Sequence, residues 1–88
     1  MTYDRIVIWT SPVEQFQKLY IFKDGVLVDQ MGVTVEDLND TLEALIDKYT
    51  INRLDFSGAH IYAQGLVKDF QEKSMLDFGV NDIRINYV

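Results

Sequence analysis

Hydrophobic residues along the chain fall into two patterns: short apolar runs typical of strands, and longer stretches in which they recur at helical spacing. The first run, Arg5–Trp9, is rich in β-branched residues and too short for a helix. It predicts a strand buried on both faces and therefore central in its sheet. Thr10-Ser11-Pro12 ends it, because proline cannot serve a central ladder, and the stretch to Gln17 is predicted to be a loop.

A β-hairpin is predicted next. Lys18–Lys23 resumes as a strand, and Val26–Met31 returns as another. Asp24-Gly25 between them is the pair that a two-residue type I′ turn favours, because both of its positions need a positive φ. The polar end of the second strand, together with Asp29, favours a position at the edge of the sheet.

An amphipathic helix is predicted to begin at Thr34, whose hydroxyl can cap the first turn. Glu36 and Asp37 suit the positive end of the helix dipole, and Lys48 suits the negative end. Apolar residues recur on a single stripe of this helix and are predicted to face the core. They are Val35, Leu38, Leu42, Leu45, Ile46 and Tyr49.

A second strand–helix unit follows and leads into a last strand. Leu54-Asp55-Phe56 predicts a short strand that breaks at Ser57-Gly58 and turns at once into a helix. That helix contains Gly65, which costs about 1 kcal/mol relative to alanine and suggests the close approach of a neighbouring backbone. The helix is expected to close at Phe78-Gly79. Asp82–Val88 then alternates apolar and polar residues and predicts a strand that is apolar on one side.

These elements follow the order β-β-β-α-β-α-β without a repeat or linker, so residues 1–88 are predicted to form a single domain of the α/β class. A hairpin pair followed by two right-handed crossovers gives a five-stranded mixed sheet in the spatial order 3-2-1-4-5. Successive crossovers in one direction lay both helices on the same face. This order resembles the core of the ribonuclease H-like superfold, and the resemblance covers nearly the whole chain as a match of element order.

Composition narrows the class of protein. Nearly half of the residues (48%) are hydrophobic, which favours a folded domain over disorder. Cysteine is absent, so neither disulfides nor a thiolate metal site is available. The sequence has no apolar stretch of the length of a signal peptide or a membrane span, and we expect a cytoplasmic protein without a membrane partner. The net charge of −6 argues against nucleic acid as the partner. No cofactor motif is present.

The resemblance implies one kind of catalytic site. Nucleases of the superfold hold two divalent metals with a cluster of carboxylates, the first of which sits in the middle of the first strand. Here that strand reads Ile6-Val7-Ile8-Trp9 and carries no acid. Asp55 on the fourth strand and Glu43 on the first helix could serve a reduced nuclease or ATP-binding relic, but two carboxylates do not make a two-metal site. We therefore expect no catalytic residue and no metal site.

Two further positions carry weaker candidate chemistry. Ser57-Gly58 at a helix start could present backbone N–H groups to an anion, although the simpler interpretation is that Ser57 caps that helix. His60, the only histidine, lacks a sequence neighbour oriented toward it and is expected on the surface.

Strand alternation assigns the side chains of the sheet to two faces, of which the helices cover one. The sequence stops in the fifth strand, where larger members of the superfold add another helix, so we expect a partner protein on the second face. A second copy in a symmetric homodimer is the simplest solution, and the alternative is that the loop Thr10–Gln17 folds across. The second face combines aromatic residues with arginines, a composition enriched in interface cores. The predicted interface residues are Val7, Trp9, Tyr20, Phe22, Arg53 and Arg84.

The leading hypothesis is therefore a non-enzymatic protein-interaction module. A second is a small acidic inhibitor of the phage or mobile-element type, whose carboxylates imitate nucleic-acid phosphates; a row of acids at regular spacing would favour it. A third is the degenerate nuclease. A fourth, stacking of single-stranded RNA on the aromatic residues, needs more basic residues than Arg53, Arg84 and Lys18 provide.

Overall fold

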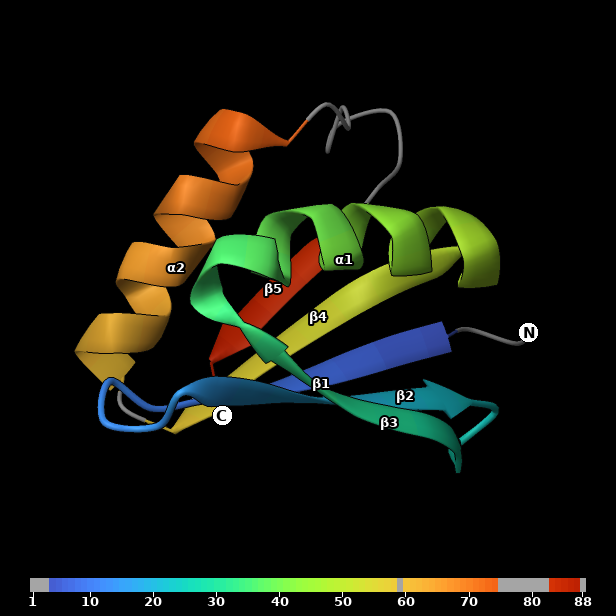
Figure 1. The fold of residues 1–88 in the computed structure, drawn as a ribbon. Coiled ribbons are helices and arrows are strands. Elements are labelled where there is room, and N and C mark those ends of the chain that lie inside the picture. Colours follow the sequence, from blue (N-terminus) through green and yellow to red (C-terminus); the bar gives the residue numbers. More distant parts are fainter. Residues whose placement is uncertain (1–3, 59, 75–82, 88) are drawn as a thin grey trace.

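The computed structural model describes residues 4–58, 60–74 and 83–87 and places them in an α/β fold of five strands and two helices (Figure 1). Their order along the chain is the order that the hydrophobic pattern predicts. The elements are β1 (Asp4–Thr10), β2 (Phe16–Lys23), β3 (Val26–Thr34), α1 (Val35–Tyr49), β4 (Ile51–Gly58), α2 (His60–Lys73) and β5 (Arg84–Tyr87).

The strands form one mixed sheet in the order β3-β2-β1-β4-β5, as predicted. β1 pairs antiparallel with β2 and parallel with β4, while β3 and β5 form the two edges. This order is compatible with a ribonuclease H-like core. The central strand is fully covered on one side only: Ile6 and Ile8 are buried, whereas Val7 and Trp9 are half-buried. The expectation of burial on both faces of this strand is therefore wrong.

Both helices lie on the same face of the sheet, which we call the inner face (Figure 1). The apolar stripe of α1 packs onto it through side chains that alternate with exposed polar ones, as the helical spacing predicts. One hydrophobic core results, and it joins both helices to the sheet. Its helical members are Leu38, Leu42, Leu45, Ile46, Ala63, Leu66, Val67 and Phe70.

The hairpin between β2 and β3 is closed by the predicted turn. Lys23 pairs directly with Val26, which leaves two residues in the loop. Asp24 and Gly25 have φ values of 55° and 78°. Two successive positive φ values are what a type I′ turn requires, and they match the right-handed twist of the flanking strands.

β2 begins at Phe16, earlier than the hydrophobic pattern predicts, so the connecting loop is confined to residues 11–15. The reason is Gln17, which is fully buried although it is polar. Its Oε1 accepts a hydrogen bond from the Ser11 backbone N–H at 2.8 Å, and its Nε2 donates to the carbonyls of Ser11 and Glu14. Because each of its polar groups is satisfied, glutamine can occupy a position that alternation reserves for an apolar residue.

Two local expectations are wrong. Thr34 stands at the N-cap of α1, but it makes no side-chain capping bond; its hydroxyl instead donates to a carboxylate oxygen of Asp37 at 3.2 Å. Gly65 in α2 is exposed, and a Cβ built on it would meet nothing within 4 Å, so no backbone approaches it closely. α2 ends at Lys73, earlier than expected. The predicted end at Phe78-Gly79 lies outside the described residues, as do both ends of the predicted last strand.

The close approach occurs at Gly58 instead, where β4 ends beside the end of β1. Gly58 has a φ of 101°, and a Cβ there would collide with the Thr10 carbonyl oxygen. The Thr10 hydroxyl also donates to the Ser57 carbonyl at 2.8 Å, which fixes the two strand ends together. Ser57 belongs to the strand, so the interpretation of this residue as a helix cap is replaced by a role in the sheet.

Neither helix of the described residues combines the length and the apolar character that crossing a membrane would require.

Replacement of Gly58 by alanine is expected to destabilise the fold by about 3 kcal/mol, because the new methyl group meets the Thr10 backbone and the positive φ is strained. Urea denaturation measures the change. The matched control is Gly65→Ala, which adds the same methyl group in open space inside a helix and should stabilise by roughly 0.5–1 kcal/mol. Equal stabilities for the two variants would contradict the role given to Gly58.

Candidate functional site: the outer face of the sheet

The face of the sheet opposite the helices, which we call the outer face, carries the side chains that alternate with the core residues. The strand register places Arg5, Arg53 and Arg84 side by side on β1, β4 and β5. The next row holds Tyr20, Val7, Asp55 and Asn86, and a third row holds Lys18 and Trp9. Among the described residues, no helix covers this face (Figure 1).

Two aromatic side chains of the outer face, Phe22 and Trp9, lie beneath cations. The Arg5 guanidinium carbon is 4.6 Å from the centre of the Phe22 ring, and the Lys18 ammonium is 5.2 Å from the Trp9 ring. A cation over a ring face is attracted by the electron-rich π system. Each of these two rings is half-buried, so this part of the face is a mixed aromatic and basic surface.

Asp55 holds the arginine row together. Its Oδ1 accepts hydrogen bonds from Arg53 Nε at 2.9 Å and from Asn86 Nδ2 at 3.1 Å, and its Oδ2 lies 3.7 Å from an Arg5 nitrogen. The Asp55 side chain is only 3% exposed, whereas those of Arg5 and Arg53 are 36% and 40% exposed. The carboxylate is therefore desolvated and fully engaged, while the arginines keep contact with water.

All six predicted interface residues lie on the outer face by strand register. The hypothesis that they form an interface remains a prediction. Two basic residues of the same surface, Arg5 and Lys18, were not among them. Each stands two positions before a predicted interface residue, Val7 and Tyr20, so strict alternation extended to the strand ends would have found both.

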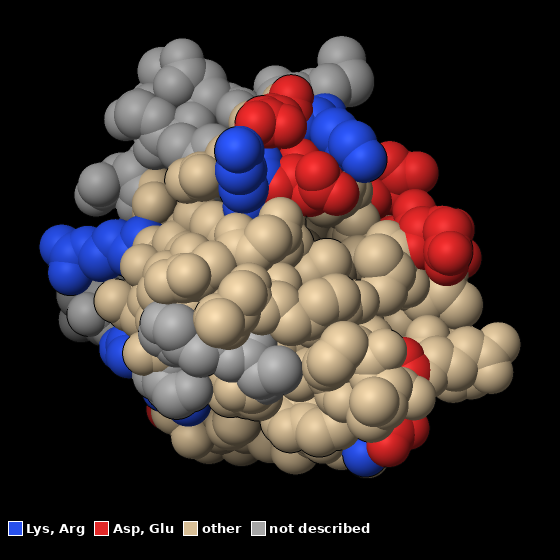
Figure 2. Space-filling model, turned by 90° about the vertical axis from the view of Figure 1, so that its left-hand side faces the viewer, with Lys and Arg blue, Asp and Glu red and all other residues tan. Residues whose placement is uncertain are grey.

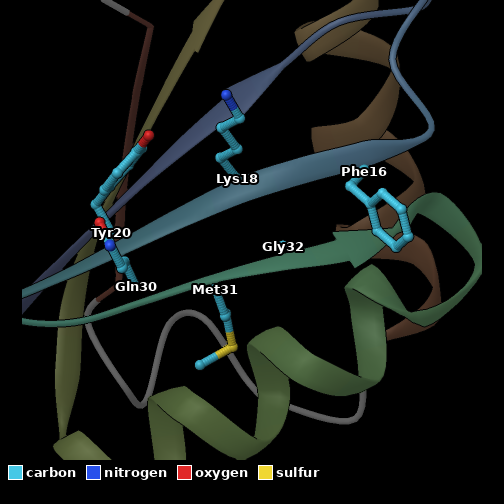
Figure 3. A pocket seen from close by; sticks show the side chains of 6 residues that line it. All are labelled: Phe16, Lys18, Tyr20, Gln30, Met31 and Gly32. Carbon is cyan, nitrogen blue, oxygen red and sulfur yellow. The ribbon is translucent and has the colours of Figure 1, made fainter.

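A hollow of about 510 Å³ opens on the outer face between β2 and β3. Gly32 forms its floor, because the absence of a side chain leaves space beside Lys18, with which it pairs. Figure 3 shows Lys18 and Tyr20 standing on one side of β2 and Phe16 lying beside the end of β3, while Met31 points the other way, toward α1. The hollow thus combines aromatic walls with an ammonium group at its rim.

Charge is distributed unevenly over the molecule. Of the described acidic residues, only Asp55 points to the outer face, against four basic ones: Arg5, Lys18, Arg53 and Arg84. Figure 2, which views the end where the loop 11–15 and the start of α2 lie, shows acidic side chains gathered mostly at the top, on the helical side. A chain with a net charge of −6 therefore presents a basic sheet face.

The candidate metal acids do not come together. Asp55 points to the outer face, while Glu43 belongs to α1 on the inner side of the sheet. Within residues 4–58, 60–74 and 83–87 there is no group of three or more carboxylate, histidine or cysteine side chains placed to hold a metal. His60 is the first residue of α2.

The loop 11–15 does not fold over the aromatic side chains. Val13 at its tip is 87% exposed, and Phe16 just after it is 50% exposed. A loop lying across the sheet would bury both. The alternative in which this loop hides the outer face is therefore wrong.

No protein-family model matches the chain, and a search of curated proteins likewise finds no match. Solved structures do resemble it. A crystal structure of an Aquifex aeolicus member of the Ppx/GppA protein family aligns with a TM-score of 0.53 and 14% identity, over 100% of this chain and 35% of that one. A structural study of the Aquifex aeolicus PPX-GPPA enzyme gives a TM-score of 0.51 and 14% identity, over 99% of this chain and 36% of that one.

The chain thus spans about a third of the length of these proteins. At this identity the likeness concerns the fold alone. It agrees with a sheet whose strand order is compatible with a ribonuclease H-like core.

Replacement of Asp55 by asparagine is expected to lower the free energy of unfolding by about 1–3 kcal/mol, because it removes the charge that Arg5 and Arg53 share and leaves a buried amide in its place. Chemical denaturation measures the loss. The control is Asp69→Asn, since Asp69 pairs with Lys73 on the exposed surface of α2 and should cost less than about 0.5 kcal/mol. An Asp55 variant as stable as the control would show that the network contributes nothing.

Proposed function

We propose that this protein is a non-enzymatic interaction module that binds an acidic segment of a partner protein on the outer face of its sheet. The single observation that carries the proposal is the basic and aromatic surface around Arg5, Arg53, Arg84, Lys18 and Trp9, set on a chain that is acidic as a whole. Aromatic residues and arginine are the residue types enriched at interface centres.

The charges of the outer face favour an acidic partner over a second copy docked face to face. In a symmetric dimer through this face, the four cations of one copy would meet the four cations of the other. Like charges brought together in an interface cost several kcal/mol. An acidic segment meets the same cations with opposite charge and needs no rearrangement of the Asp55 network.

A protein partner is favoured over single-stranded nucleic acid because cations already lie over two of the aromatic rings on the outer face. Base stacking needs free ring faces, because the base must lie flat against the π surface. Arg5 and Lys18 already lie over Phe22 and Trp9. On these two rings a base could stack only by displacing the cations, whereas a carboxylate could bind the cations where they are.

The proposal predicts that selection from random peptides displayed on phage enriches acidic sequences, and that these bind through the outer face. Charge reversal at two exposed outer-face positions, Lys18→Glu with Arg84→Glu, should weaken binding at least about tenfold, because close charge pairs contribute to affinity. Isothermal titration calorimetry with a selected peptide measures the change.

The matched control is Lys48→Glu with Lys68→Glu, which makes the same change in net charge on exposed positions of the helices. Selection that enriches no acidic peptide, or equal weakening by both double variants, would contradict the proposal. Preferential binding of poly(U) over every selected peptide would replace the protein partner by single-stranded nucleic acid.

The hollow above Gly32 is predicted to receive an apolar side chain of the bound segment. Gly32→Leu would fill it, and the site tolerates a side chain because the nearest atom to an added Cβ is Phe16 Cβ at 3.5 Å. We expect this variant to weaken peptide binding about tenfold while leaving its salt dependence unchanged, since a filled pocket removes apolar contact and no charge.

Gly65→Leu is the control, since it adds the same side chain at an exposed glycine of α2. Thermal unfolding of both variants separates a loss of binding from a loss of structure. Undiminished peptide affinity in a folded Gly32→Leu protein would exclude the hollow from the binding surface.

A second candidate function, the charge-mimicking inhibitor, is favoured by a row of acids on α1. Glu36, Asp40, Glu43 and Asp47 recur at intervals of three and four residues and so share one face of the helix. A solvated helix face carries the same pattern, and this function therefore ranks second. If the protein is such an inhibitor, it binds a nucleic-acid-binding protein through this acidic row, and the double variant Asp40→Lys with Asp47→Lys should abolish that binding.

A further inference from the structure

We infer that the chain associates head to tail with itself, the outer face of one copy binding the acidic face of α1 in the next. This rests on the proposed function, because it names the acidic partner. Two surfaces carry it: the cations of the outer face, and the row of acids on α1, which is made of Glu36, Asp40, Glu43 and Asp47.

The acid row faces solvent. The buried residues of α1 form a stripe around Leu42 and Leu45, and the acid row lies on the opposite side of the helix. Glu36, Asp40 and Asp47 are exposed, and Glu43 is half-buried. At a rise of about 1.5 Å per residue, the row is roughly 16 Å long. It lies on the helical side of the molecule, where Glu36 and Asp40 also border a hollow between α1 and α2 that Asp69 and Lys73 line from the other helix.

The two surfaces carry opposite net charge on opposite sides of one sheet. α1 and α2 together hold seven carboxylates against three lysines, since α2 adds Asp69 and Glu72. The outer face holds four basic groups against the single carboxylate of Asp55, which is already engaged. A second copy translated along the normal of the sheet therefore meets complementary charge, which steers association and fixes orientation.

The dimensions of the two surfaces agree. Neighbouring strands lie about 4.8 Å apart, so the arginine row across β1, β4 and β5 spans roughly 10 Å. Lys18 on β2 lengthens this basic surface along the strands toward the hollow. A helix about 16 Å long in its charged part is longer than this row and can contact its three arginines at once.

The arrangement is heterologous, because two different surfaces of the chain meet. Each pair leaves one basic and one acidic face free, so association continues in an open row instead of closing at a dimer. This property separates the head-to-tail contact from the symmetric homodimer, in which both copies would use the same surface.

Sedimentation velocity on two charge-reversal variants tests the inference. The basic-face variant is Lys18→Glu with Arg84→Glu, and the acidic-face variant is Asp40→Lys with Asp47→Lys. Wild type should form species that grow with concentration at low salt and dissociate when salt is raised to on the order of 0.5 M. Each variant alone should associate at least about tenfold more weakly. Mixed in equal amounts, they should associate with each other, because each variant keeps the surface that the other lacks.

The control is Glu14→Lys with Asp24→Lys, which repeats the charge change of the acidic-face variant at exposed positions of two loops and should associate as wild type does. Circular dichroism confirms that each variant is folded, and the neutral pair Lys18→Gln with Arg84→Gln provides a milder form of the basic-face variant.

A monomeric wild type at low salt would overturn the inference, as would a mixture of the two variants that stays monomeric. A dimer that survives in both variants would also overturn it, because the contact would then use another surface. If acidic peptides bind the outer face of a wild type that remains monomeric, the proposed function stands and only the identity of the partner is wrong.

Discussion

The carboxylate of Asp55 is the interaction on which the outer surface of this protein depends. It lies on β4 and contacts side chains of β1, β4 and β5 at once. Without a negative charge at this point, the guanidinium groups on these strands would stand side by side and repel one another. Because Asp55 is desolvated while the arginines remain partly hydrated, it neutralises part of their charge and still leaves them able to bind an anion.

This arrangement explains how an acidic chain can present a basic face. Net charge predicts solubility and long-range steering, but a partner meets only the part of the charge that faces it. Here the sheet separates the two signs, with most helical charges negative and most outer-face charges positive. The net charge of −6 therefore reflects mainly the acids of the helical side, and it does not reveal that the outer face of the sheet is basic.

The elements and their order could be predicted from local pattern because each depends on neighbours in sequence. The positive φ values at Asp24 and Gly25 and the apolar stripe of α1 are of this kind. The start of β2 could not be predicted in this way, because the burial of Gln17 depends on hydrogen bonds to a loop that the hydrophobic pattern treats as unstructured. Which glycine meets a neighbouring backbone also depends on tertiary contact, and it proved to be Gly58 and not Gly65.

The candidate site likewise combines features that the local sequence pattern predicts with features that depend on tertiary contacts. Alternation assigned Trp9, Tyr20 and Arg53 to one face, since a strand has a side-chain period of two. It could not reveal that Arg5, Arg53 and Arg84 form a row, because that depends on the register between strands far apart in the sequence. Nor could it show that Asp55, a candidate metal ligand from the sequence, is engaged by two arginines and an asparagine.

The hydrogen bonds of Gln17 have a consequence for the evolution of the chain. One buried amide holds the ends of the loop 11–15, so the loop keeps its path without burying any apolar side chain of its own. Val13 at the tip touches little else and can change freely. The segment is therefore a natural place for an insertion or a grafted sequence, where new recognition could be gained while the sheet stays as it is.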